Sequence, residues 1–518
     1  MKLPFLRLIS LLLVTITVIF ATGCDMSHMF EELDAKQKEK FQDFTTKKTE
    51  QSTLKQTDTS KGSETVNMDN IALDLLNFDG MTLNILVHND KKIQREWYGN
   101  GAEELLATAV EYRNSAVTDK LNLNATYFEG VSGFGLSQSS SFSDMIVNDV
   151  ISAKHQYDIS AHSATLTASL AIRDCAANFL DEDTFPYFNF NLSCWNKSLI
   201  ANTTVNEKLY YLAGDLNFSV FDSAAVVWYN DTLYQSKKSS SDPDDLQSFA
   251  LAGKWDYDDL YGWITRFDGG SPAFSANAKS PLLINSNSGF LSGTIPSAWQ
   301  LNLMTRDTAD AYRFNINGNT KAENALTKYK RLLNDTGVIS GASNVFTSKK
   351  AVFYMSELYE SESTNESIHS MSNDYALLPF PKYNSDQQEY KTSCSDTHSL
   401  IMALDHSRGG TTVRGAAISA FLQTSSEHAY SNVRINYYYD IACSSQSSDD
   451  DNNTDIEIFN LIVDSIDLSF MNIYSPQLNG AYYLWETAAQ NSSLATAFNE
   501  DYTAYANSCD DTAEWLCG

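Results

Sequence analysis

The chain has 518 residues, 43% of them hydrophobic, and a formal net charge of −29 at pH 7. This apolar content is ordinary for a folded protein, and the length is enough for two or three domains. Because so acidic a surface repels nucleic-acid phosphates and anionic lipid headgroups, we expect no nucleic-acid partner.

The N-terminal segment has the pattern of an export signal. Lys2 and Arg7 form a short basic region, and residues 8–20 form an apolar run that is too short to span a bilayer of about 30 Å. The run is followed by Ala21-Thr-Gly-Cys24. Small residues before a cysteine resemble the bacterial lipobox, where the signal is removed and the cysteine carries the lipid.

This pattern predicts a lipoprotein. We expect residues 1–23 to be the signal peptide, Cys24 to be the lipidation site, and the protein to be lipid-anchored at the extracellular face of the cell membrane. Residues 24–70 are mostly polar, with charged runs such as KQKEKF, so we expect them to bury too little surface to order and to form a flexible tether. The alternatives are a secretory signal with an incidental cysteine and a frayed N-terminus without a role.

Strand and helix patterns alternate from residue 81 onward. Apolar runs of strand length and helical periodicity predict strand 81–87, loop 88–100, helix 103–121, strand 123–128, helix 142–153 and strand 157–159. This rhythm is typical of a parallel sheet with helices on both faces.

The second half continues the alternation. Further strands are expected at 209–212, 224–229, 351–354, 375–378 and 399–404, and further helices at 255–267, 321–333, 412–423 and 456–469. The polar, acidic segment 444–455 resembles a calcium-ligand set only loosely, and a solvated loop is the favoured interpretation; a metal there is left open.

Six cysteines remain if Cys24 is lipidated. They are Cys175, Cys194, Cys394, Cys443, Cys509 and Cys517. No CxxC or His-rich spacing indicates a metal site, and we expect no metal and no cofactor. Disulfides are permitted in an exported protein, with 15 possible pairings, of which Cys509 with Cys517 is favoured by proximity alone.

Several motifs in a shared order carry a family resemblance over roughly residues 80–475. They are Gln94-Arg-Glu-Trp97, Tyr157-Asp-Ile159, Lys208-Leu-Tyr-Tyr-Leu-Ala-Gly-Asp215, Val227-Trp-Tyr-Asn230, Gly253-Lys-Trp255 and Leu377-Leu-Pro-Phe-Pro-Lys-Tyr383. In this order they resemble the family-1 extracellular solute-binding proteins, the class of the maltose-binding protein. The resemblance is closest to the lipid-anchored members of that family. The chain departs from the family at Asp256, where Thr is usual, and in its six cysteines.

The resemblance implies an α/β fold of the two-lobed periplasmic-binding-protein type II, with a hinge and an interlobe ligand cleft. The implied boundaries are 80–212 plus 396–428 for lobe 1 and 225–384 plus 430–518 for lobe 2, with hinge crossings near 213–225, 384–396 and 426–436.

The implied function is capture of a sugar or oligosaccharide by hinge closure and its delivery to the permease subunits of an ABC importer, by a monomer without enzymatic activity. The 27 Tyr and 8 Trp residues suit pyranose rings, whose C–H faces stack on aromatic rings. The alternatives are a binder of peptide or another non-sugar solute on the same fold, a lipid-anchored glycoside hydrolase, which would need two carboxylates at a defined separation, and a purely structural surface lipoprotein.

Ligand contacts are expected at the ends of strands and beside the crossings. The candidates are Arg95, His162, Trp195, Asp215, Asp222, Tyr354 and Asp396. Each has a structural alternative: a salt bridge for Arg95, a capping role for His162. Trp195, which has the polar neighbours Asn196 and Lys197, is expected to be a half-exposed platform or a surface ring that covers a loop.

Overall fold

The computed structural model describes residues 73, 75–99, 102–130, 140–267, 280–287, 289–335, 337–362, 368–405, 412–444, 453–490 and 493–517. All of them belong to one compact unit, Met68–Gly518, which is separate from a unit of residues Met1–Asn67. The predicted signal peptide, Cys24 and the whole predicted tether lie outside the described residues. None of the helices in the described part is both long and apolar enough to cross a bilayer.

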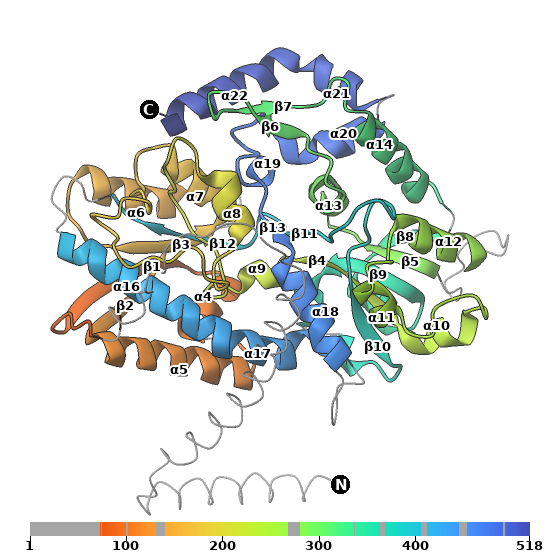
Figure 1. The fold of residues 1–518 in the computed structure, drawn as a ribbon, viewed down its shortest axis with the longest axis horizontal. Helices are drawn as coiled ribbons and strands as arrows, with labels where there is room; N and C mark the ends of the chain where they lie inside the picture. The colour runs from red at the N-terminus through yellow and green to blue at the C-terminus, as the bar shows by residue number, and fades with distance from the viewer. Residues whose placement is uncertain are drawn as a thin grey trace, which may run out of the picture. The chain divides into compact units, whose positions relative to one another are not determined.

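Lobe 1 is built on a four-stranded sheet in the order β12-β3-β1-β2. The strands are β1 (Met81–His88), β2 (Leu123–Gly130), β3 (Ile159–Ser163) and β12 (Ser399–Ala403). β1 is parallel to β2 and β3, and β12 is antiparallel to β3. Figure 1 shows helices on both faces, with α5 (Glu104–Leu121) and α16 (Thr412–His428) on one and α6 (Ser140–Ile151) and α7 (Ala164–Ala171) on the other.

Lobe 2 is built on a five-stranded mixed sheet in the order β10-β4-β9-β5-β8. The strands are β4 (Ala225–Asn230), β5 (Ser280–Asn285), β8 (Val338–Gly341), β9 (Ala351–Glu357) and β10 (Tyr375–Pro379). β5 is parallel to β8 and β9, whereas β4 is antiparallel to β9 and β10. Every residue of β4 is buried, as its continuous apolar run predicts. The predicted α/β class with two lobes is confirmed.

The helices of lobe 2 lie around its sheet. They are α10 (Asp231–Lys237), α11 (Leu246–Leu251), α12 (Tyr257–Phe267), α13 (Phe290–Ala298), α14 (Thr320–Leu333) and α15 (Ser343–Thr347). The C-terminal helices are α19 (Phe470–Ile473), α20 (Leu484–Gln490), α21 (Leu494–Glu500) and α22 (Tyr502–Cys517).

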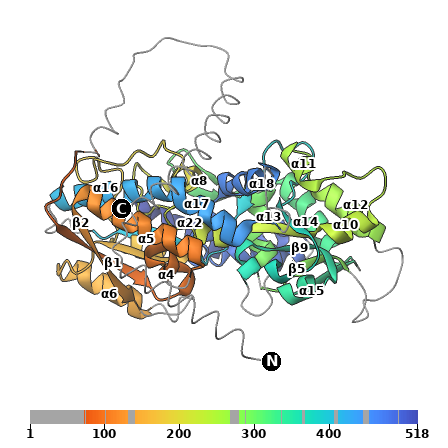
Figure 2. The ribbon, with the colours of Figure 1, turned by 90° about the horizontal axis from the view of Figure 1, so that it is seen from below.

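Several segments connect the two sheets. Helix α9 (Ser219–Asp222) precedes β4, and β11 (Thr392–Ser393), which precedes β12, pairs with β13 (Ile466–Asp467). Figure 2 shows α17 (Arg434–Tyr437) and α18 (Asn453–Asp464) between the two groups of strands. The numbered lobe boundaries and hinge crossings stay predictions.

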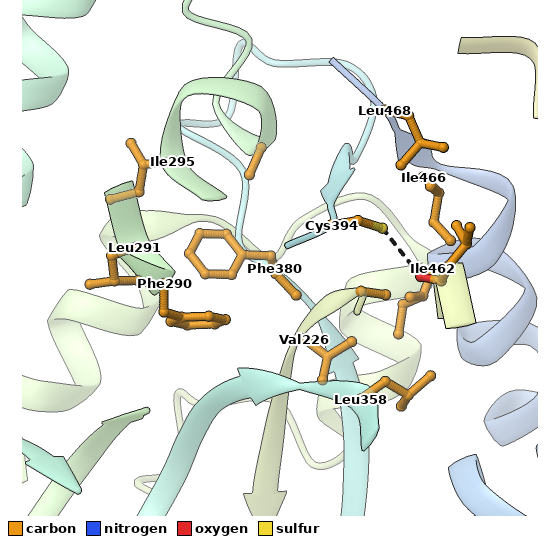
Figure 3. Packing of buried hydrophobic residues seen from close by; sticks show 14 of the residues in the cluster. Val226, Phe290, Leu291, Ile295, Leu358, Phe380, Cys394, Ile462, Ile466 and Leu468 are labelled. Carbon is orange, nitrogen blue, oxygen red and sulfur yellow. Dashed lines mark hydrogen bonds between the residues drawn. The ribbon is translucent and has the colours of Figure 1, made fainter. Parts of the chain in front are cut away.

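The core near these segments joins parts of the chain that are far apart in sequence. Figure 3 shows apolar side chains of α13, of β4 and of the 462–468 segment close to Cys394, which follows β11, and all of them belong to one buried cluster. The thiol of Cys394 on this crossing donates to the carbonyl of Val220, at 3.3 Å from sulfur to oxygen.

Helix α4 (Lys91–Tyr98) replaces the loop that the sequence predicts at 88–100. The Asp90 carboxylate accepts from the backbone N–H of Lys92 at 2.8 Å, and Gly99 ends the helix at φ = 71°. Asp is a common N-cap residue and Gly a common C-cap residue. These two residues indicate a helix, although the polar composition of the segment favoured a loop.

One predicted strand is wrong, and one predicted helix is present but ends earlier than predicted. Residues 209–212 form only an isolated bridge, between Leu212 and Ile401, rather than a strand. The helix predicted at 456–469 is α18, which ends at Asp464, because the chain then extends as β13 to pair with β11.

In the part of the chain whose side chains the structure describes, the cysteines form no disulfide. They are Cys175, Cys194, Cys394, Cys443 and Cys509. The pairing of Cys509 with Cys517 is wrong because both residues lie on α22, eight residues apart. At about 1.5 Å rise per residue, this spacing separates their Cα atoms by roughly 12 Å, beyond the reach of a disulfide.

We predict that Cys509 is fully alkylated when the chain is denatured without reductant, because no disulfide protects it. Peptide mass spectrometry after iodoacetamide treatment checks this. Recovery of Cys509 in a disulfide-linked peptide would contradict the structure.

Candidate functional site

Polar side chains from the two lobes meet at the carboxyl ends of β1 and β9. Lys92, in the first turn of α4 after β1, places its Nζ 3.7 Å from the Oε2 of Glu357 at the end of β9. Next along the chain, the ring of Tyr359 faces the Lys92 ammonium at 4.7 Å and the Arg95 guanidinium at 4.6 Å. Because open α/β sheets bind ligands beyond the carboxyl ends of their strands, this is where a ligand site is expected.

Two tyrosines lie close to the same carboxylate. Tyr482 and Tyr483, on the short helix η5 (Ala481–Tyr483), have ring centroids 5.1 Å apart at an interplanar angle of 72°. Burial raises the pKa of Tyr482, and the charges of Asp396 and Glu357 raise it further. The phenol therefore keeps its proton, and its hydroxyl both donates and accepts hydrogen bonds. We call Lys92, Glu357, Tyr359, Asp396, Tyr482 and Tyr483 the interlobe site.

The two tyrosines differ in exposure. Tyr482 is 9% exposed, because its ring lies against Gly293 of α13, where a Cβ atom would come within 2.1 Å of the ring. Tyr483 is 50% exposed. The pair thus offers one fixed ring and one open aromatic face, beside the exposed carboxylate of Asp396.

A buried amide lies at the end of β5, next to the end of β9. The Asn285 side chain is buried, and its Oδ1 accepts from the backbone N–H of Asn287 at 2.9 Å. Its Nδ2 has no hydrogen-bond partner among the residues that the structure describes. A buried donor without a partner is costly, so a ligand oxygen or a bound water is the partner to expect here.

Arg95 and Asp222, both predicted site residues, come together as a buried ion pair between α4 and α9. Their side chains are 3% and 0% exposed. The hydroxyl of Tyr437, on α17, also donates to Asp222, at 2.8 Å between the oxygens. Arg95 has the salt-bridge role given above as its structural alternative.

The neighbouring Glu96 joins α4 to two crossing segments. Its Oε2 accepts from the backbone N–H of Ser219 at 2.8 Å, and its Oε1 accepts from the hydroxyl of Ser399. Burial raises the pKa of Glu96 to about 8, although these hydrogen bonds lower it, and the charge of Asp222 raises it further. Glu96 was absent from the predicted residues, and no sequence signal marked it.

Asp215 forms a second buried cluster away from the interlobe site. Its Oδ1 lies 3.7 Å from Nη1 of Arg434, whose Nη2 bonds Oδ1 of Asp464 at 2.8 Å. Burial raises the pKa of Asp215 to about 7, against the charge of Arg434. The cluster ties the segment before α9 to the start of α17 and the end of α18.

His162 and Tyr354 are core residues. His162 is 1% exposed, with ring centroids 4.2 Å from His88 and 4.4 Å from Phe142. Burial, and then the charge of His88, lowers the pKa of His162 to about 2, so its imidazole is neutral. Tyr354 lies on the central strand β9, and its side chain has no exposed surface.

Trp195 is not a half-exposed ring; it is 2% exposed. Phe188 and Phe190 pack on it with centroids 5.8 and 6.0 Å away, and its indole N–H donates to the Oε1 of Gln423 at 3.0 Å. Its polar neighbours in sequence misled the prediction: Asn196 is the N-cap of α8 (Lys197–Thr203).

Of the residues in the interlobe site, the sequence analysis named only Asp396. It did not name Lys92, Glu357, Tyr359, Tyr482 and Tyr483, nor the nearby Asn285. The ends of the 81–87 and 351–354 runs pointed to Lys92 and Glu357; the two tyrosines follow a turn-rich segment whose path no local pattern predicts.

The described residues contain no group of three or more His, Cys, Asp or Glu that could hold a metal. Most of the 444–455 loop lies outside the described residues. Asp455, at its end, already accepts from Gln247, Tyr438 and Ser444.

No family model and no curated protein sequence matches this chain. Solved structures do match it. The sugar-binding protein MalE from Xanthomonas citri has a TM-score of 0.53 at 9% identity, over 84% of this chain and 98% of that one. The galacto-N-biose-/lacto-N-biose I-binding protein of an ABC transporter from Bifidobacterium longum has 0.52 at 10% identity, over 84% and 98%. A cyclic alpha-maltosyl-1,6-maltose binding protein from Arthrobacter globiformis has 0.51 at 12%, over 84% and 98%.

The chain has the fold of these ABC-transporter-type sugar-binding proteins. The resemblance predicted from the sequence is therefore confirmed for the fold, across most of this chain and nearly all of theirs. At this identity the shared property is the two-lobed solute-binding fold itself, and the ligand depends on the residues of this chain.

We predict that stability falls as pH rises from about 4.5 to about 8, in part through Glu96. An acid whose folded-state pKa is raised favours folding fully below its ordinary pKa of 4.5, and this contribution is lost as pH rises through about 8. Glu96→Gln keeps an acceptor but no titratable proton, so its melting temperature should change less across this range. Glu104→Gln, at an exposed site, is the matched control and should follow the wild type. Parallel curves for wild type and Glu96→Gln would contradict the assignment.

Proposed function

We propose that this protein captures a sugar or oligosaccharide outside the cell and delivers it to an ABC importer. The observation that carries the proposal is Tyr483, a half-exposed ring beside the Asp396 carboxylate in the interlobe site. An aromatic face next to carboxylate and amide groups suits a pyranose, whose C–H face stacks while its hydroxyls bond the polar groups.

The groups around Tyr483 complement a polyhydroxylated ligand. Lys92 offers three donors, the Asn285 amide offers an unused donor, and Glu357 and Asp396 offer acceptors. Burial raises the pKa of Glu357, against the charge of Lys92, so this carboxyl also donates when protonated. Neutral hydroxyls satisfy such a mixed set without adding charge to a site that already holds two carboxyl groups.

Of the residues that the sequence suggested, we keep Asp396 as a ligand contact. We propose that the other six act structurally, because they are buried in ion pairs or in apolar packing: Arg95, His162, Trp195, Asp215, Asp222 and Tyr354. The sugar-binding proteins of similar fold favour a binding role over an enzymatic one. The proposed role is therefore that of a binder without catalytic activity.

Since Lys92 and Glu357 come from different lobes, a ligand that contacts both favours closure through its added contacts. We propose hinge closure as the capture mechanism and the permease subunits of an importer as the partner, with the protein acting as a monomer. A closed, loaded form then differs in surface from the empty form, which is what a permease would recognise.

A glycan library and a peptide library, screened by thermal shift, test the ligand class. A ligand at 100 times its dissociation constant should stabilise the protein by about 2.7 kcal/mol. Shifts with oligosaccharides and none with peptides are expected. Shifts with peptides alone would overturn the proposal, and release of sugar products from a stabilising glycan would reveal an enzyme.

We predict that Tyr483→Ala weakens binding of the glycan found in that screen by roughly 2 kcal/mol or more, since it removes the stacking face. Its melting temperature should change little, because half of the ring is exposed. Tyr502→Ala, at a tyrosine that is 53% exposed on α22, is the matched control and should bind normally. Isothermal titration calorimetry measures both; equal affinities in the two variants would remove Tyr483 from the site.

We also propose the lipid anchor at Cys24, from the Ala21-Thr-Gly-Cys24 sequence. Cys24→Ser should lose incorporation of labelled palmitate and leave the membrane fraction or keep its signal uncut. Several acyl chains are needed for durable anchoring, so the change should be nearly complete. A Cys24→Ser chain that still takes up palmitate would show that the lipid is attached elsewhere.

A further inference from the structure

A β-hairpin from lobe 2 reaches a helix of lobe 1 outside the interlobe site. The hairpin consists of β6 (Met304–Arg306) and β7 (Tyr312–Phe314), joined by a turn that the Asp307 carboxylate holds through the N–H groups of Ala309 and Ala311. At its base the Asn315 N–H donates to the carbonyl of Leu303 at 2.7 Å, and the following helix α14 joins lobe 2 through the ion pair of Lys328 with Asp258 on α12.

The hairpin completes the C-terminus of α8. The last carbonyls of a helix have no partner within it, and they form the negative end of its dipole. Here the Arg306 Nη2 donates to the carbonyl of Ala201 at 2.6 Å, and the Tyr312 hydroxyl donates to that of Asn202 at 2.8 Å. Two orphan carbonyls of lobe 1 are thus satisfied by side chains of lobe 2.

A third bond extends the contact past the helix. The backbone N–H of Asn206, in the turn after α8, donates to the Oδ2 of Asp310 at 3.0 Å. Asp310 in turn pairs with Arg306, at 2.7 Å between Oδ1 and Nη1, so one hairpin ion pair binds both sides of the turn. Tyr312 also stacks on Phe470 of α19, with ring centroids 4.0 Å apart.

These contacts are few and partly exposed. Arg306 and Asp310 have 28% and 39% of their side chains exposed. A pocket of about 290 Å³ lies beside them, lined by residues of both lobes and of the crossings, among them Asn202, Met304, Tyr312, Lys391 and Asp467. The hairpin therefore meets α8 through a small set of hydrogen bonds, beside apolar packing of Val205, Tyr312 and Phe470.

We propose that the β6–β7 hairpin is a strap that stabilises the lobe arrangement in which Lys92 meets Glu357, and so sets how readily the lobes separate. The inference rests on the proposed hinge closure. Any contact that joins the lobes in only one arrangement shifts the equilibrium toward that arrangement, whether or not it touches the ligand. Loss of the strap favours separated lobes. It lowers the apparent ligand affinity by the factor by which the binding-competent fraction of molecules falls.

The test uses the whole protein without any sugar, so that it does not depend on carbohydrate binding. Spin labels are placed through a ketone-bearing amino acid at Ile151 of lobe 1 and Leu333 of lobe 2, which are 68% and 45% exposed. Double electron–electron resonance spectroscopy then measures the distribution of distances between the two spin labels. Arg306→Gln with Tyr312→Phe removes both bonds to α8 and keeps the Tyr312–Phe470 ring stack.

The double variant should shift the population ratio toward longer distances by on the order of ten-fold, as expected for two lost hydrogen bonds, one of them charged. Arg313→Gln is the matched control: it lies on the same hairpin but pairs with Asp307 and Asp510, away from lobe 1. Its distances should equal those of the wild type. If the double variant melts abnormally, Tyr312→Phe alone should give a smaller shift in the same direction.

Unchanged distances in the strap variants would overturn the proposal, as would an equal shift in Arg313→Gln. Neither result bears on the glycan screen. A failed glycan screen with a shifted distance distribution would instead keep the strap and reject the sugar ligand.

Discussion

Two buried side chains of α4, the Arg95 guanidinium and the Glu96 carboxyl, join α4 to the segments that connect the two lobes. Arg95 pairs with Asp222 on α9, and Glu96 accepts from Ser219 on α9 and from Ser399 on β12. Removing one partner of a buried ion pair such as Arg95 and Asp222 leaves an uncompensated charge, which costs several kcal/mol. An eight-residue helix thereby fixes the start of β4 and the start of β12 relative to lobe 1.

The same helix begins at the interlobe site. Lys92 lies one turn before Arg95 and Glu96, so its ammonium is positioned by a helix whose other end is fixed to the crossings. A side chain on a short, doubly fixed helix loses little further freedom when it binds a ligand. The contact between Lys92 and Glu357 therefore reports on the geometry of the crossings as well as on the ligand.

The sequence predicted most of the sheets, because apolar runs such as 81–87 and 224–229 are typical of buried strands. It predicted the site poorly, because buried charge is invisible to such patterns. Arg95 and Asp222 were chosen as ligand contacts since they lie beside a strand end and a crossing, and nothing local reveals that they pair across 127 residues. Trp195 failed for a related reason: its cover, Gln423, comes from α16, more than 200 residues away. The position of Tyr483 in the site follows from the packing of η5 against α13, which no local sequence pattern predicts.

The buried thiols bear on how this protein meets oxidants. Burial raises the pKa of Cys175, Cys194, Cys394 and Cys509, so thiolate, the reactive form, is scarce while the fold is intact. On unfolding, the same cysteines regain ordinary thiol pKa values and become free to pair with one another. In an oxidising compartment, each full opening of the core thus carries the risk of a covalent cross-link that refolding cannot undo. The time the protein survives there is set by how rarely it unfolds rather than by its equilibrium stability.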